Sequence, residues 1–114
     1  MKLNIYGKDE NGKKIIIKTY EAQTYDLMFG TIEDVAEAVN LDSLKTGSNA
    51  EIIKMVGNLV TNSMGTVKEL LFDIFDGLTE DEVKHTTVIE IANVIVEVVL
   101  YTIKQLNLSA QGKN

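Results

Sequence analysis

One short pattern divides residues 31–90: a Ser or Thr followed three positions later by an acid. In such a capping box, the hydroxyl and the carboxylate accept hydrogen bonds from backbone N–H groups that lack partners at a helix start. The pairs are Ser48 with Glu51, Thr66 with Glu69, Thr79 with Glu82, Thr87 with Glu90 and, more weakly, Thr31 with Asp34. Single glycines precede most of these starts, as is common where the previous helix ends. The pattern predicts five helices, over residues 32–39, 49–64, 67–76, 80–85 and 88–106.

Two of the predicted helices have a clear apolar face. Apolar residues recur in them at intervals of three and four, which places them on one side of a helix. In the segment 49–64 they are Ile52, Val56, Leu59, Val60 and Met64, and in the segment 67–76 they are Val67, Leu70, Leu71, Ile74 and Phe75. These residues are the predicted core.

The N-terminal residues have the pattern of a β-hairpin. Residues 3–6 and 15–20 favour strands, and Asn11-Gly12 between them supplies the positive φ angles of a tight turn. A two-residue loop would place Glu10 opposite Lys13 and Asp9 opposite Lys14. A two-stranded ribbon is marginally stable alone, so we expect it to pack against the helices or a neighbouring chain.

These elements predict a mainly helical α+β fold, in which a small helical bundle packs against a two-stranded ribbon. The chain has 114 residues, of which 45% are hydrophobic and 25% charged, as in an ordinary single domain. We expect this domain to span residues 1–106, with the hairpin in 1–20 and the bundle in 31–106. Residues 107–114 are expected to form a flexible tail.

The segment 88–106 is apolar around most of its circumference. Its polar stripe is narrow and consists of Glu90, Asn93, Glu97 and Lys104. A core-facing stripe is expected from Val88, Ala92, Ile95, Val99, Ile103 and Leu106. Ile89, Val96 and Leu100 then form a second apolar flank, and Tyr101 lies among the polar positions. Either this is a central helix surrounded by its own chain, or Ile89, Val96, Leu100 and Tyr101 contact a partner or a second copy.

Two other interpretations of this segment are less favourable. A membrane span is disfavoured because two Glu and one Asn fall within nineteen residues and basic anchors are missing. The β-branched run 94–99 would suit a strand, but the length of the segment and the cap at Thr87 favour a helix.

Composition argues against several classes of function. Eleven Lys and no Arg stand against seventeen acids, giving a net charge of −6, which repels nucleic acid. The chain has no Cys and one histidine, His85, so we expect no catalytic residues, no metal site and no cofactor. The absence of Cys and of an apolar leader after Lys2 predicts a cytoplasmic protein.

The sequence LLFDIFDGLTEDE (residues 70–82), continuing into VIEI (residues 88–91), resembles the tail assembly chaperones of long-tailed phages and prophages of Gram-positive bacteria. The resemblance covers residues 20–106, and many relatives carry proline at the position of Asp76. It implies a protein of the host cytoplasm that binds the tape-measure protein, keeps it soluble and helps to recruit tail-tube subunits.

The resemblance also suggests a longer form made by ribosomal frameshifting. Lys113-Asn114 can be encoded by an A-rich slippery heptamer, so we hypothesise a slip site at the 3′ end of the gene. The alternative to a chaperone is a generic helical adaptor or a self-assembling phage structural protein, in which the apolar flank of 88–106 closes a homo-oligomer.

Overall fold

The computed structural model describes residues 1–39 and 48–111, with side chains to residue 105. Within these residues the chain forms a two-stranded antiparallel ribbon followed by five α-helices, which confirms the predicted α+β fold. The strands are β1 (Lys2–Lys8) and β2 (Lys14–Glu21), and a short 3-10 helix η1 (Thr24–Asp26) follows. The helices are α1 (Phe29–Val39), α2 (Asn49–Asn62), α3 (Met64–Ile74), α4 (Glu80–Val83) and α5 (Val88–Gln111).

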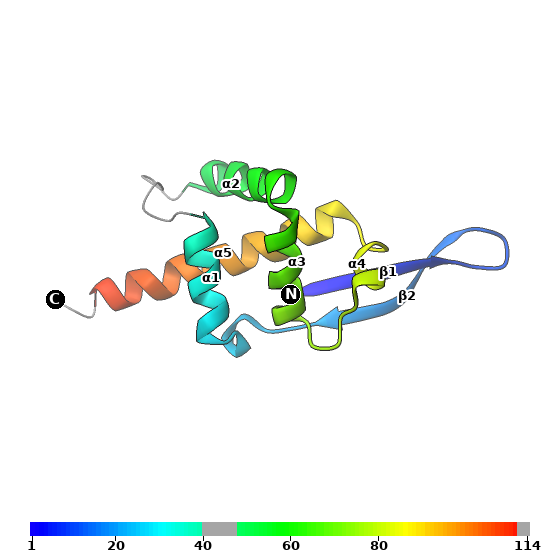
Figure 1. The fold of residues 1–114 in the computed structure, drawn as a ribbon, viewed down its shortest axis with the longest axis horizontal. Coiled ribbons are helices and arrows are strands. Elements are labelled where there is room, and N and C mark those ends of the chain that lie inside the picture. Colours follow the sequence, from blue (N-terminus) through cyan, green and yellow to red (C-terminus); the bar gives the residue numbers. More distant parts are fainter. Residues whose placement is uncertain (40–47, 112–114) are drawn as a thin grey trace.

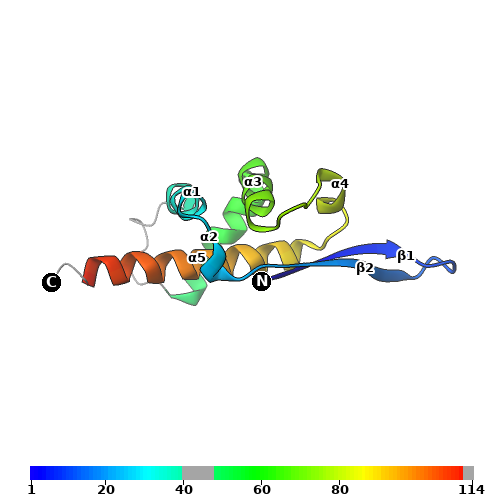
Figure 2. The same ribbon diagram turned by 90° about the horizontal axis from the view of Figure 1, so that it is seen from below.

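The molecule is elongated, with extents of 60 × 25 × 20 Å. Helix α5 and the ribbon both follow the long axis, and the turn of the hairpin projects beyond the helices (Figure 1). Helices α1, α3 and α4 lie on one side of α5 and the ribbon (Figure 2). Helix α2 contacts α5 as well, and in this view it passes behind α5 to the opposite side.

The core lies where α1, α2 and α3 meet α5, and the start of the ribbon adds Leu3 and Ile5. The predicted apolar faces are largely confirmed. All five core residues predicted for 67–76 are buried, as are Ile52, Val56 and Leu59 of α2, while Val60 and Met64 are partly buried. The tertiary contacts therefore follow the helical spacing read from the sequence.

Three of the five predicted helix caps are confirmed. The hydroxyls of Ser48, Thr79 and Thr87 each accept a hydrogen bond, at 3.2 Å, from the backbone N–H three residues later. At Thr79 the carboxylate of Glu82 also accepts from the Thr79 N–H, which completes the capping box. These side chains satisfy donors that the helix itself cannot.

The caps predicted at Thr66 and Thr31 are wrong, because both residues lie inside helices. Helix α3 begins at Met64, and Ser63 serves as the C-cap of α2 and the N-cap of α3. Helix α1 begins at Phe29, and Thr31 is buried on its core-facing side. Each helix starts two residues before the expected cap, so Thr31 and Thr66 have helical residues on both sides and cannot act as N-caps.

The turn of the hairpin is correctly located, but the predicted register is wrong. Lys8 lies opposite Lys14, and Asp9 Oδ1 accepts hydrogen bonds from the N–H groups of Asn11 and Lys13, both at 2.9 Å. Gly12 has a φ of 79°. The Asp9 carboxylate and the left-handed glycine thus stabilise a wider loop than the expected two-residue turn. A bulge at Ile17 then restores the pairing of Ile5 with Lys18.

Helix α5 continues to Gln111, so the predicted helix end at residue 106 is too early. No glycine or proline occurs between Val88 and Gln111, and the polar residues of 107–111 tolerate a helical backbone. Residues 112–114, with the hypothetical slip site, lie outside the described residues.

Candidate protein-binding surface

The buried face of α5 contacts the other helices. Ile95 and Val99 of the predicted core stripe are buried, and Ala92 and Ile103 are partly buried. Val88, however, is 63% exposed, and the side chain of Leu106 is outside the described set. The fully buried positions are instead Ile91, Val94, Ile95, Val98, Val99 and Thr102. The predicted stripe was therefore placed at the wrong rotation, because sequence alone does not show on which side α1 and α3 lie.

The opposite face of α5 is open to solvent and partly apolar. Ile89 is 73% exposed and Leu100 is 42% exposed, and Val96 is partly buried between this face and the core. Asn93 is exposed and Ile103 is half-buried. The expectation of a helix enclosed by its own chain is therefore wrong for this face. We call Ile89, Asn93, Val96, Leu100 and Ile103 the α5 outer stripe.

The fourth predicted partner-binding residue, Tyr101, does not belong to this stripe. It is half-buried, and at ~100° per residue it lies about a quarter turn from Leu100, beyond the charged edge of the stripe. The structure therefore brings Ile89, Val96 and Leu100 onto one face and leaves Tyr101 beside it.

Charged residues line one edge of the outer stripe. Glu90, Glu97 and Lys104 follow one another at intervals of seven residues along α5. The Glu97 carboxylate lies 3.6 Å from the amino group of Met1 and stays 54% exposed. The edge thus carries two acids near the start of the helix and one lysine further along.

Glu90 fixes the start of α5 against the ribbon. Its Oε1 accepts a hydrogen bond of 3.0 Å from the backbone N–H of Asn4, and its Oε2 accepts one of 2.8 Å from the Thr87 hydroxyl. Burial raises the pKa of Glu90, but hydrogen bonds from Thr87, Tyr6 and Asn4 outweigh it, so the pKa lies below its ordinary value. A charged carboxylate therefore connects β1 to the first turn of α5.

A second polar contact holds α4 to the ribbon. The Tyr20 hydroxyl donates a hydrogen bond of 2.5 Å to Glu82 Oε1, and Lys18 Nζ lies 3.4 Å from Glu82 Oε2. The hydrogen bond from Tyr20 is the main reason that the pKa of Glu82 is lowered. The ribbon is therefore attached at α4 as well as at α5, as its marginal stability requires.

Two other groups of exposed apolar residues were not predicted. Ile15, Ile16 and Ile17 are exposed on β2, and Tyr25, Met28 and Phe29 are exposed around η1 and the start of α1. A run of three isoleucines without alternation would have been a usable signal, because a half-buried strand alternates apolar and polar residues. These two groups lie on β2 and around η1 and the start of α1, and so are separate in sequence from the α5 outer stripe.

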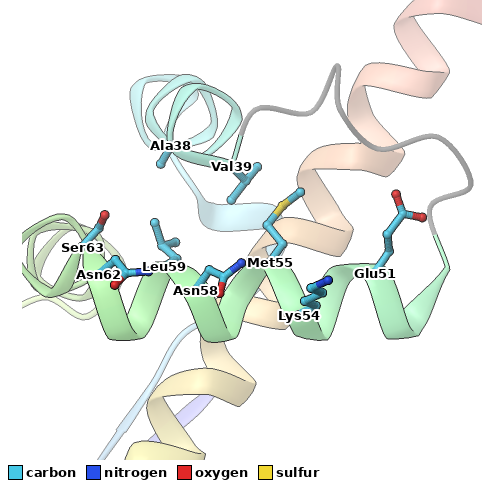
Figure 3. A pocket seen from close by; sticks show the side chains of 9 residues that line it. All are labelled: Ala38, Val39, Glu51, Lys54, Met55, Asn58, Leu59, Asn62 and Ser63. Carbon is cyan, nitrogen blue, oxygen red and sulfur yellow. The ribbon is translucent and has the colours of Figure 1, made fainter.

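Two hollows of the surface lack the form of a small-molecule site. One of about 440 Å³ lies between α1 and α2 and is lined by mixed side chains such as Met55, Asn58 and Asn62 (Figure 3). Another, between α1 and α3, is lined by Asp34, Glu37, Glu69 and Asp73. Neither combines an apolar interior with converging polar groups, which is the usual form of a ligand pocket.

Among residues 1–39 and 48–111, no group of three or more His, Asp or Glu side chains is placed to hold a metal ion. His85 is exposed at the end of α4, and its Nδ1 lies 2.9 Å from the carbonyl oxygen of Asp81. In the same described residues, none of the helices has both the length and the apolar character needed to cross a bilayer.

Comparison with known proteins gives no match: no protein-family model, no curated protein and no solved structure is significantly similar to this chain.

Proposed function

We propose that this protein binds other proteins through the α5 outer stripe and acts as a phage tail assembly chaperone. In this role it binds the tape-measure protein, keeps it soluble and helps to recruit tail-tube subunits. The partners come from the resemblance of residues 70–82 and 88–91 to such chaperones. The observation that carries the proposal is the exposure of Ile89 and Leu100 on a helix whose other face is already core.

Exposed apolar side chains on a rigid helix gain free energy when a partner covers them. Each Å² of apolar surface removed from water contributes about 25 cal/mol. Because α5 is packed against α1, α2 and β1, the outer stripe is presented on a backbone that is already ordered. Little conformational entropy is then lost when a partner binds.

The chemistry of the stripe suits a helical partner. An amphipathic helix that lies along α5 could place its own apolar residues against Ile89, Val96 and Leu100. A tape-measure protein, as a long helical chain with apolar stripes, offers such segments. The net charge of −6 would help to keep the resulting complex in solution.

The proposal is tested by co-expression with the tape-measure protein encoded in the same genome. We expect the native chain to raise the soluble fraction of the tape-measure protein and to be recovered with it. The variant Ile89→Glu/Leu100→Glu should lose both effects, because two charges would have to be buried against apolar surface. Ile53→Glu on α2 is the matched control, since Ile53 is 61% exposed and lies on another helix.

The proposal fails if the double variant solubilises the tape-measure protein as well as the native chain does. It also fails if the native chain has no effect on that protein. Circular dichroism of both variants would show that their folds are intact.

A self-assembling phage structural protein or adaptor is the second candidate. The observation that favours it is the exposure of Ile15, Ile16 and Ile17 on β2. The outer edge of β1 cannot pair with another copy, since the backbone N–H groups of Asn4 and Tyr6 already donate to the Glu90 carboxylate and to the carbonyl of His85. A second copy would therefore pack on β2. If this candidate is correct, light scattering of the purified protein will show oligomers that Ile16→Lys abolishes, and the tape-measure protein will not bind.

A further inference from the structure

We propose that the outer edge of β2 binds an extended segment of another protein as an added β-strand, and that this segment is apolar with acidic residues at its ends. The surface differs from the α5 outer stripe in position and in the form of its ligand, since the stripe suits a helix and the edge suits a strand. The inference therefore goes beyond the proposed function and does not depend on it.

The two edges of the ribbon differ in their backbone hydrogen bonds. The edge of β1 is used within the chain, because the N–H groups of Asn4 and Tyr6 donate to α5 and to the turn after α4. In an antiparallel pair, a residue whose N–H points away from the ribbon lies opposite a residue whose N–H and C=O also point away. Asn4 lies opposite Thr19, and Tyr6 lies opposite Ile16. The backbone groups of Thr19 and Ile16 therefore point outward from β2.

The outer edge of β2 presents a row of such groups. The alternation of the ladder extends it to Lys14 and Glu21, which lie two residues beyond Ile16 and Thr19. All four positions are exposed. Within residues 1–39 and 48–111, no backbone hydrogen bond joins these groups to another element. A row of unpaired N–H and C=O groups on an exposed strand is a template for one more strand.

The side chains of β2 define the apolar part of the ligand. Ile15 lies opposite Gly7, and a Cβ atom at Gly7 would lie 2.9 Å from Cγ2 of Ile17, so both isoleucines are on one face of the ribbon. Ile16 is on the other face, opposite Tyr6. The three isoleucines are 39%, 54% and 61% exposed. An added strand therefore meets apolar side chains on both of its faces, and covering them contributes to binding.

Lysines flank the three isoleucines. Lys13 and Lys14 precede them and Lys18 follows. Residues 8–18 contain four lysines and two acids, although the whole chain has a net charge of −6. Lys18 already pairs with a carboxylate of α4, whereas Lys13 and Lys14 form no ion pair within the described part of the chain. An acidic segment is thus attracted to this end of the molecule, which projects beyond the helices (Figure 1).

The same lysines disfavour a second copy of the chain at this edge. If the isoleucines of two antiparallel copies faced each other about Ile16, Lys14 of one copy would lie near Lys18 of the other. Like charges opposite each other destabilise a strand pair. The bulge at Ile17 also shortens the stretch that an added strand can pair with, as is common at edges that do not aggregate. A partner with acids at its ends meets no such repulsion.

The test is fluorescence anisotropy of a labelled peptide titrated with the full chain. The peptide contains the order Glu-Val-Val-Val-Glu-Glu, which in antiparallel alignment places glutamates opposite Lys18, Lys14 and Lys13. We expect saturable binding at micromolar concentrations that weakens as the salt concentration rises. One control peptide has lysine in place of glutamate. Another has N-methyl groups on the valine nitrogens, which keeps the side chains and removes the N–H donors. Both should bind about tenfold more weakly or less.

Variants of the chain locate the site. Lys14→Glu should raise the dissociation constant of the acidic peptide about tenfold or more, and Lys54→Glu on α2 is the control for net charge. Ile16→Pro removes an outward N–H that β1 does not use and should abolish binding, whereas Ile16→Val keeps that donor and should bind like the native chain. The variant Ile89→Glu/Leu100→Glu should also bind the peptide normally, because its changes are on α5.

Several results would overturn the inference: no binding of the acidic peptide, equal binding of the lysine peptide, or equal binding of the N-methylated peptide. Oligomers of the native chain that Ile16→Lys abolishes and that exclude the peptide would also overturn it, since the edge would then belong to a second copy. Thermal unfolding checks that every variant is folded. If Ile16→Pro is unfolded, the N-methylated peptide still tests the same backbone hydrogen bonds from the side of the ligand.

Discussion

The carboxylate of Glu90 accepts a hydrogen bond from the backbone N–H of Asn4 across 3.0 Å, although the residues are 86 positions apart. The same carboxylate accepts from the Thr87 hydroxyl at the start of α5. One side chain therefore holds the capping hydroxyl of α5 and accepts a backbone N–H at the outer edge of β1. Through it the ribbon orients the helix that carries the proposed binding surface.

Replacing Glu90 by Ala should lower the free energy of unfolding by about 1–3 kcal/mol, because the Asn4 N–H loses a charged acceptor and α5 loses part of its cap. Chemical denaturation measures the change. Glu33→Ala, which removes an exposed carboxylate from α1, is the control and should alter the value by less than about 0.5 kcal/mol. Equal effects of the two variants would contradict the role given to Glu90.

The contribution of Glu90 should depend on pH. Its pKa is lowered in the folded protein, so its stabilisation is fully present above the ordinary glutamate pKa of about 4.3 and is lost as the pH falls through the lower folded value. The difference in unfolding free energy between the native chain and Glu90→Ala should therefore shrink on acidification below about pH 4. A difference that stays constant or grows would show that the hydrogen bonds do not require the charged form.

Two glycines should respond oppositely to the same substitution. Gly77 has a φ of 85°, so Gly77→Ala should destabilise the fold by about 1 kcal/mol or more. Gly57 lies exposed inside α2 with open space around its Cα, so Gly57→Ala should stabilise it by about 0.5–1 kcal/mol. Thermal unfolding of both variants measures the sign of each change in stability. Changes of the same sign would mean that one of these backbone conformations is wrong.

The corrected helix caps give a further pair of variants with different expected effects on stability. Thr79→Ala removes the cap of α4 and should cost about 1 kcal/mol, whereas Thr66→Ala changes a residue inside α3 and should be neutral or slightly stabilising. Urea denaturation distinguishes them. If Thr66→Ala costs as much as Thr79→Ala, then α3 starts at Thr66, as the sequence pattern alone suggested.

Local patterns allowed much of the fold to be predicted. The Asn11-Gly12 turn, the caps at Ser48, Thr79 and Thr87, and the core face of α3 depend on residues close in the chain, and the structure confirms them. The hairpin register was not predictable in this way, because it depends on the Asp9 carboxylate, which accepts two backbone N–H groups.

The binding surface could be predicted only in part. Ile89, Val96 and Leu100 were grouped on one flank, since α5 has more apolar residues than a core stripe requires, but the sequence left open whether that flank is enclosed, and only the structure shows that Ile89 and Leu100 are exposed. Which residues face the core depends on the placement of α1, α2 and α3, which no local spacing contains. For the same reason the exposure of Phe29 and Ile17 was not foreseen.

The central claim is that the outer face of α5 binds a helix of another protein. It is tested most directly by nuclear magnetic resonance, in which an amphipathic helical fragment of the tape-measure protein is titrated into the labelled chain. The account predicts that the largest changes occur at the methyl groups of Ile89, Val96 and Leu100, with Ile53 on α2 unaffected. Binding that changes α2 or the hairpin and leaves these three methyl groups unchanged would contradict it.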